Sequence, residues 1–214
     1  EVIFDKARGE YMIYWTHLNR DSDLDTIPWY AYTKDFTTLT TLPQILCKPK
    51  SGLCAIDGDI VEKDGKYYLY LCSDGNCEAV AVSDKPYGPF TDAKPVVGAD
   101  GDGIDPSVFI DDDGQVYYLW GQFSLKGAKL MDDMCTVDPD SVVKGVLTEQ
   151  EHGFHEGASI RKINGKYYIV YTDISRGRAT CMSYAVADSP LGPYKRGGVI
   201  VDNMFCDPQT WNNH

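Results

Sequence analysis

Basic residues are scarce in this sequence. Its 214 residues contain 20 Lys and Arg against 32 Asp and Glu, which gives a formal net charge of -12 at pH 7. Nucleic acids and anionic membranes attract basic surfaces, so this balance argues against both as partners. An uncharged ligand is compatible with it.

Long hydrophobic runs, a signal peptide and an initiator Met are also absent. No segment is apolar over enough residues to span a bilayer, and none shows a sustained helical period. The chain opens inside a strand-like run and stops where the repeats described below predict another hairpin. We therefore expect an internal fragment of a longer protein.

Zinc-finger spacing is missing as well. The seven cysteines are an odd number, so at least one has no partner within the chain. Cys72 and Cys77 flank a turn, and Cys47 and Cys54 bracket a glycine loop. No His neighbours either pair, which argues against a metal site there. Buried or partly exposed thiols are the favoured interpretation.

One pattern is repeated four times along the chain. An apolar run, a turn with glycine and a second apolar run recur about every 50 residues, with the turns at Gly9, Gly65, Gly114 and Gly165. Such runs predict β-hairpins, and this period is typical of propeller blades. The expected repeats cover residues 1–42, 57–98, 103–147 and 156–201, and a further one starts in 202–214.

The fold class that follows is an all-β chain, a β-propeller whose blades surround a central channel. The hairpin strands are apolar on both faces, which fits blades packed between neighbouring blades. In the first repeat we expect a third strand over Trp29–Tyr32 and an outer strand around Thr37–Leu42. Residues 1–214 are then a single, incomplete propeller domain.

Acidic residues open the repeats. The first strand of each blade lines the channel, so Asp57, Asp105, Glu156 and the terminal His214 are expected to converge there. Pro106 restricts the backbone of the residue before it and predicts an extended Asp105, with its side chain fixed at the start of a strand.

Carboxylates from different blades suit glycoside hydrolysis with inversion, which needs a proton donor for the leaving oxygen and a carboxylate that activates water. Glu156 is the candidate acid, because its long side chain reaches the channel and Phe154 and His155 precede it. Asp105 is the candidate third carboxylate, which modulates the pKa of the acid through like-charge repulsion.

A local role is the alternative for each carboxylate, since either alone can bond backbone groups at the start of a strand. The shared position of Asp105 and Glu156, nine residues before the turn glycine, favours the catalytic interpretation. Asp57 lies eight residues before Gly65, and with Asp59 so close a structural role is favoured for that pair.

Aromatic rings stack on the apolar faces of sugars, so Trp120, near a blade mouth, is a candidate substrate-binding residue. Asp57 and His155 are the other two candidates for substrate binding. The alternative for Trp120 is packing between blades, because it occupies the same hairpin position as Trp15.

Several motifs resemble glycoside hydrolase family 43: Gly103-Ile-Asp-Pro-Ser-Val-Phe-Ile-Asp-Asp-Asp-Gly114, Glu156-Gly157 before Asn164-Gly-Lys-Tyr-Tyr168, Ser189-Pro-Leu-Gly-Pro-Tyr194 and Asn212-Asn-His214. The resemblance implies a five-bladed propeller, here about four blades without the N-terminal start and the closing blade. It implies action on arabinose- or xylose-containing polysaccharides, with Glu156 as general acid and Asp105 as pKa modulator. His214 would match a channel histidine associated with Ca²⁺ or a similar ion; no cofactor is required. A secreted or periplasmic location is expected.

Two departures from the family pattern stand out. Ala158 replaces the usual Pro after Glu-Gly, and Asp57-Gly58 stands where Ala-Pro is frequent. The general base, an aspartate in an Asp-Pro motif, is expected about two residues before Glu1, outside this chain. We therefore expect weak or no activity from these 214 residues alone, and activity from the intact protein.

Two other functions stay open. A catalytically silent carbohydrate-binding propeller is compatible with Ala158 and with a base outside the chain. A protein-interaction propeller of the Kelch or WD type is disfavoured, because the sequence has no Trp-Asp signature and no Gly-Gly pair repeated from blade to blade, and because this function leaves the repeated carboxylates unexplained. The oligomeric state is open.

Overall fold

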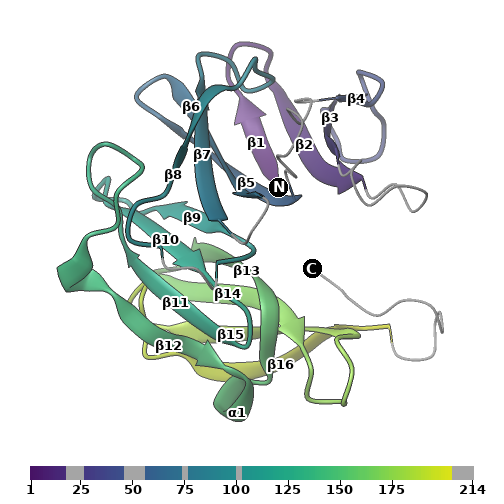
Figure 1. Cartoon of the computed structure of the whole chain (residues 1–214). Helices are drawn as coiled ribbons and strands as arrows, with labels where there is room; N and C mark the ends of the chain where they lie inside the picture. The colour runs from purple at the N-terminus through teal and green to yellow at the C-terminus, as the bar shows by residue number, and fades with distance from the viewer. Residues whose placement is uncertain (18–26, 46–55, 74–76, 100–102, 204–214) are drawn as a thin grey trace. The chain divides into compact units, whose positions relative to one another are not determined.

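A computed structural model describes the chain except for residues 18–26, 46–55, 74–76, 100–102 and 204–214. The chain divides into two compact units, Glu1–Val96 and Val97–His214. Nearly all regular structure is β-strand (Figure 1). None of the helices in the described ranges has the length and apolar character that a membrane span requires.

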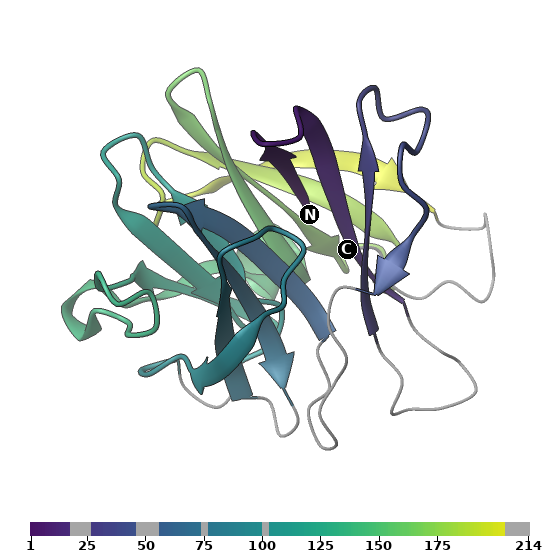
Figure 2. The same cartoon turned by 90° about the horizontal axis from the view of Figure 1, so that it is seen from above.

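The first unit contains two antiparallel sheets, each of four strands in chain order (Figure 2). The sheets pack on each other through Tyr and aliphatic side chains, among them Met12, Tyr32 and Leu69. The strands of the first sheet are β1 (Val2–Asp5), β2 (Glu10–His17), β3 (Ile27–Thr33) and β4 (Gln44–Ile45). Those of the second are β5 (Ile56–Lys63), β6 (Lys66–Ser73), β7 (Cys77–Ser83) and β8 (Thr91–Pro95).

The second unit repeats this arrangement and adds two short helical turns, η1 (Pro139–Ser141) and α1 (Glu149–His152). The strands of its first sheet are β9 (Ser107–Ile110), β10 (Val116–Trp120), β11 (Ser124–Lys129) and β12 (Val143–Thr148). Those of its second sheet are β13 (Phe154–Ile163), β14 (Lys166–Asp173), β15 (Cys181–Ala187) and β16 (Lys195–Asp202).

Four consecutive four-stranded antiparallel sheets are the blades that the repeats predicted, so the all-β propeller class is confirmed. The four predicted turn glycines all have positive φ, between 66° and 84°, which glycine adopts without a steric penalty. The further repeat expected in 202–214 lies outside the described residues from position 204 onward.

The outer strand of the first blade differs from the prediction. It is Gln44–Ile45, whereas the segment predicted as strand, Thr37–Leu42, follows a compact turn. There the Asp35 carboxylate accepts hydrogen bonds from the backbone N–H groups of Thr37 and Thr38. A side chain that bonds nearby backbone groups competes with a strand ladder, and here the turn prevails.

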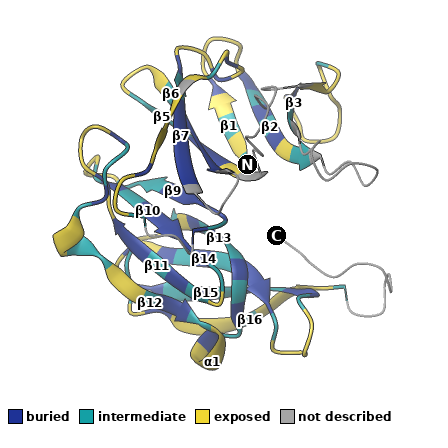
Figure 3. Ribbon diagram, viewed as in Figure 1, coloured by how far each residue is buried: buried dark blue, intermediate teal, exposed yellow. Residues whose placement is uncertain are grey.

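Burial alternates along β14 and β15, while β16 is exposed over most of its length (Figure 3). The buried side chains join those of the preceding blade in one core that contains Leu119, Leu147, Phe154, Ile160 and Tyr171. Each such side chain contributes roughly 1.5–3 kcal/mol by leaving water.

The cysteines of the described ranges agree with the interpretation as buried or partly exposed thiols. Cys72 and Cys181 are buried thiols and Cys135 is a half-buried one. Burial also raises the pKa of the Cys181 thiol, which reduces its reactivity at neutral pH.

A charged cluster joins the two blades of the second unit at their hairpin ends. Asp111 accepts hydrogen bonds from Lys162 Nζ at 2.6 Å and from Tyr167 Oη at 2.5 Å. Lys162 also contacts Asp112 at 2.8 Å. Burial alone would raise the pKa of Asp111, but the hydrogen bonds from Lys162 and Tyr167 bring it below its usual value.

We expect Asp111→Ala to lower the free energy of unfolding by about 2–3 kcal/mol, because it removes two hydrogen bonds to a charged acceptor. Asp112→Ala is the matched control. Its side chain is 85% exposed and contacts the same Lys162, so about 0.5 kcal/mol is expected.

Urea unfolding measures both differences. Because the folded pKa of Asp111 lies below the unfolded one, its contribution is present above the unfolded pKa and disappears as the pH falls. The difference between the native protein and Asp111→Ala should therefore shrink below about pH 4. Equal effects of the two variants at neutral pH would contradict a specific role for Asp111.

Candidate active site

Asp105 lies two residues before β9 and is buried, but its backbone is not extended. Its φ of 53° places it in the left-handed region, so the extended conformation predicted from Pro106 is wrong. Proline disfavours the right-handed helical region in the residue before it and leaves other regions open. Aspartate tolerates the left-handed region because its short side chain can bond nearby groups.

The Asp105 carboxylate is directed to the next blade. Its Oδ2 accepts a hydrogen bond from the backbone N–H of Gly157 at 3.0 Å. Gly157 itself has a φ of 67°, a conformation that favours glycine. This bond joins Asp105 to the peptide that immediately follows Glu156.

Glu156 lies near the start of β13, and the residue is buried, with 5% of its surface exposed. The pairing of β13 with β14 is irregular on both sides of Glu156, between Phe154 and Glu156 and again before Ser159. Such β-bulges re-aim side chains next to functional sites. The structure thus brings the two predicted carboxylates, Asp105 and Glu156, together across neighbouring blades.

Gln122, which sequence reasoning missed, also contacts Glu156. Its Nε2 donates a hydrogen bond to Glu156 Oε2 at 2.5 Å. Gln122 follows the buried strand β10, which runs antiparallel to β9. The end of β10 therefore lies at the same edge as the start of β9. A polar residue directly after Trp120-Gly121 was the available signal.

Phe123 completes this turn and was also missed. Its φ is 63° and the residue is 50% exposed. Its ring meets the His155 ring edge to face, with the ring centroids 5.1 Å apart. The backbone is held on both sides, because Phe123 N–H donates to His155 O at 2.7 Å and Phe123 O accepts from Glu149 N–H at 3.1 Å.

The short helix α1 fixes the start of β13. The Thr148 hydroxyl caps it by accepting from Glu151 N–H at 3.2 Å, and Gly153 ends it with a φ of 70°. His152 is buried: its Nδ1 accepts from Thr148 N–H at 3.1 Å, and its Nε2 lies 3.2 Å from Tyr194 O. Nε2 is therefore the protonated nitrogen.

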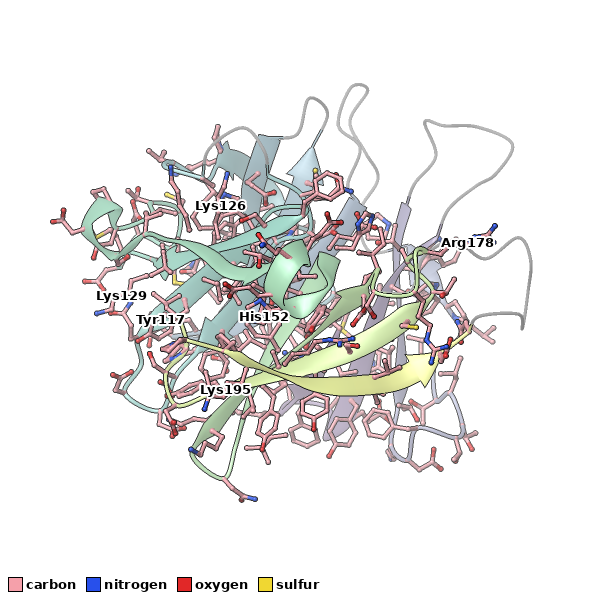
Figure 4. All side chains as sticks on the ribbon, turned by 90° about the horizontal axis from the view of Figure 1, so that it is seen from below. Tyr117, Lys126, Lys129, His152, Arg178 and Lys195 are labelled. Atoms are coloured by element: carbon pink, nitrogen blue, oxygen red, sulfur yellow. The ribbon has the colours of Figure 1, made fainter. Side chains whose placement is uncertain are left out.

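Figure 4 labels His152 on α1 and places Arg178, in the loop after β14, at the end of this unit opposite Tyr117. At the end of β14, Asp173 pairs with Arg196 at 2.6 Å and with the backbone N–H of Ser175 at 2.6 Å. Burial alone would raise the pKa of Asp173, but these hydrogen bonds hold it below its usual value. Asp173 stays charged and fixes this end of the blade.

The other predicted site residues divide into two groups. His155 is half-buried beside Glu156, with its Nδ1 3.2 Å from Glu149 Oε1, so a substrate contact from it stays a prediction. Trp120 is 1% exposed and packs on Tyr118 at 5.5 Å, which fits the packing alternative. The Trp120 ring therefore exposes no face on which a sugar could stack in this structure.

Asp57 lies in β5, and its side chain is outside the described part of the structure. The hairpin β5–β6 has the register of β13–β14 shifted by 100 residues: Ile56 pairs with Cys72 as Glu156 pairs with Thr172. Asp57 thus occupies the position of Gly157, one residue away from that of Glu156. Its role in substrate binding stays a prediction.

His214 lies outside the described residues, so its metal role stays a prediction too. Among the residues that the structure describes, no group of three or more His, Cys, Asp or Glu side chains could hold a metal ion. The Ca²⁺ site expected from the resemblance stays a prediction, and no step below depends on one.

The fold and site together define a β-propeller with a buried pair of carboxylates where its blade strands begin. The sequence model of glycosyl hydrolases family 43 matches residues 14–212. The chain therefore belongs to glycosyl hydrolase family 43.

Individual relatives agree with this assignment. A β-xylosidase of Xylanibacter ruminicola is 34% identical, over 74% of this chain and 59% of that protein. A xylosidase/arabinosidase of Bacteroides ovatus is 35% identical, over 78% and 61%. The structure of an α-L-arabinofuranosidase from Clostridium thermocellum superposes with a TM-score of 0.77 at 26% identity, over 99% of this chain and 74% of that one. The chain thus spans about 60% of the length of these two curated relatives.

Proposed function

We propose that the full-length protein hydrolyses glycosidic bonds in arabinose- or xylose-containing saccharides with inversion at the anomeric carbon. Membership of family 43 supports a glycoside hydrolase, and the xylosidase and arabinosidase relatives support these two sugars. The observation that carries the proposal is the bond from Gly157 N–H to Asp105, which holds a second carboxylate beside the buried Glu156.

In the proposed mechanism, Glu156 gives its proton to the glycosidic oxygen as the bond between that oxygen and the anomeric carbon breaks. A water molecule attacks the opposite face of the sugar and loses a proton to the general base. We place that base on an aspartate about two residues before Glu1. Asp105 is the modulating carboxylate, whose charge lies one peptide away from Glu156.

Sugar release by the full-length protein tests this function. The substrates are an aryl α-L-arabinofuranoside, an aryl β-D-xyloside and linear arabinan, and proton NMR of the first product reports its anomeric configuration. Release of arabinose or xylose with inverted configuration is expected. A protein that binds these saccharides but releases nothing would be a silent carbohydrate-binding propeller.

Phe123 is proposed as a sugar contact next to Glu156, because its exposed ring lies on His155. Phe123→Ala should raise KM about two- to tenfold with little change in kcat, since ring stacking contributes about 0.5–1.5 kcal/mol. The matched control is Phe36→Ala in the first unit, where an exposed Phe also has a φ near 60°. An unchanged KM in Phe123→Ala would contradict this contact.

A further inference from the structure

Gln122 stands out because its amide bonds directly to the proposed acid. The bond joins Gln122 Nε2 to Glu156 Oε2 at 2.5 Å, and Glu156 is a buried residue. A hydrogen bond to a carboxyl group is stronger in such shielded surroundings than in water. It therefore restricts the orientation of the Glu156 carboxyl.

The backbone around Gln122 is built to hold this position. Ser124 N–H donates to Gln122 O at 2.7 Å across Phe123, whose positive φ is uncommon for a large residue. The two bonds of Phe123 to His155 O and to Glu149 N–H connect the turn to both ends of the segment that leads into Glu156. A strained backbone persists where the surrounding structure fixes it.

We propose that Gln122 is a positioning residue that holds Oε2 of Glu156, so that Glu156 delivers its proton to the leaving group from Oε1. The Gln122 N–H donates to Oε2 both when Glu156 is a carboxylic acid protonated on Oε1 and when it is a carboxylate, so Oε1 is the oxygen that carries the proton. This inference rests on the proposed role of Glu156 as the acid.

The proton balance gives Gln122 a second effect. When the proton of Glu156 moves from Oε1 to the glycosidic oxygen, the carbon–oxygen bond breaks and Glu156 becomes a carboxylate. A hydrogen bond from an amide N–H to a charged acceptor is about twice as strong as one to a neutral acceptor. The bond from Gln122 therefore strengthens as the proton leaves, and it stabilises the transition state more than the bound substrate.

Leaving-group dependence provides the test, because a poor leaving group needs the proton and an activated one does not. In the full-length protein, Gln122→Met keeps the side-chain size and removes the bond to Oε2. We expect kcat to fall roughly 10- to 100-fold for an alkyl glycoside. For the corresponding dinitrophenyl glycoside kcat should change less than about threefold, and KM should stay unchanged for both.

The matched control is Gln115→Met in the same blade. Gln115 Nε2 donates to the backbone oxygens of Val116 and Leu130, at 3.0 and 3.2 Å, at the hairpin end of the blade. Its loss affects stability alone, so both substrates should keep their kcat. If Gln122→Met fails to fold, Gln122→Asn replaces it, since the shorter side chain withdraws the amide by one methylene group.

Glu156→Gln, measured in parallel, distinguishes the positioning role of Gln122 from the acid role of Glu156 on which it rests. If Glu156→Gln shows strong leaving-group dependence while Gln122→Met slows both substrates equally or neither, the positioning role is overturned and the acid role stands. If Glu156→Gln shows no leaving-group dependence, the acid role fails and the positioning role fails with it.

Discussion

Replacing Glu156 with Gln should lower kcat for an alkyl arabinoside or xyloside by about 10²–10⁴-fold, the range that general acid catalysis supplies. The amide has the shape of the carboxylic acid, but it cannot give a proton to the leaving oxygen. The hydrogen bond with Gln122 and the fold of β13 should persist. KM should change little, because the acid stabilises the transition state and not the bound substrate.

Steady-state kinetics on the full-length protein measure this loss, and thermal unfolding checks the fold. Glu151→Gln is the matched control, since Glu151 is an exposed carboxylate on α1, just before β13. It should keep the native rate. A Glu156→Gln protein that retained the native rate on an unactivated substrate would assign the proton donor to another residue.

Asp105→Ala should lower kcat/KM by about a hundredfold, because the Gly157 peptide loses its acceptor and Glu156 shifts with it. The same change should lower the free energy of unfolding by about 2–3 kcal/mol, since it removes a hydrogen bond to a charged, buried acceptor. Alanine also adopts the left-handed backbone of position 105 less readily than aspartate does.

Asp105→Asn separates charge from geometry. Asparagine tolerates the left-handed region, and its side-chain oxygen can still accept from Gly157 N–H, so stability should fall by about 1 kcal/mol or less. Activity should nevertheless fall, because the negative charge beside Glu156 is gone. Urea unfolding and kcat/KM on the same samples measure the two effects. If the Asn variant had native kcat/KM, Asp105 would act only through the backbone.

Much of the fold follows from local sequence patterns. The four turn glycines and the paired apolar runs predict the hairpins, because a hairpin depends on residues close together in the chain. The segment 37–42 was predicted as a strand because its residues favour β structure. In the structure, the backbone N–H groups of Thr37 and Thr38 instead donate hydrogen bonds to the Asp35 carboxylate. That competition is local, but a periodicity argument does not weigh it.

The site was predicted in part. The equal spacing of Asp105 and Glu156 from their turn glycines placed them at the same end of neighbouring blades, where the structure has them joined through Gly157. Gln122 was missed because it does not precede a turn glycine by the nine residues that Asp105 and Glu156 share. Asp57 and Glu156 were compared by their distances from a glycine, whereas the strand pairing puts Ile56 at the position of Glu156.

The sequence by itself determined the blades, their order and the two carboxylates, because hairpin turns and apolar alternation act between neighbouring residues. Only the tertiary structure decided the left-handed backbone of Asp105, the bulges around Glu156 and the hydrogen bond from Gln122. Each of these depends on groups of different blades or strands that meet only when the sheets pack. The reason is that a buried polar group takes the conformation that satisfies its hydrogen bonds, even where local preference favours another.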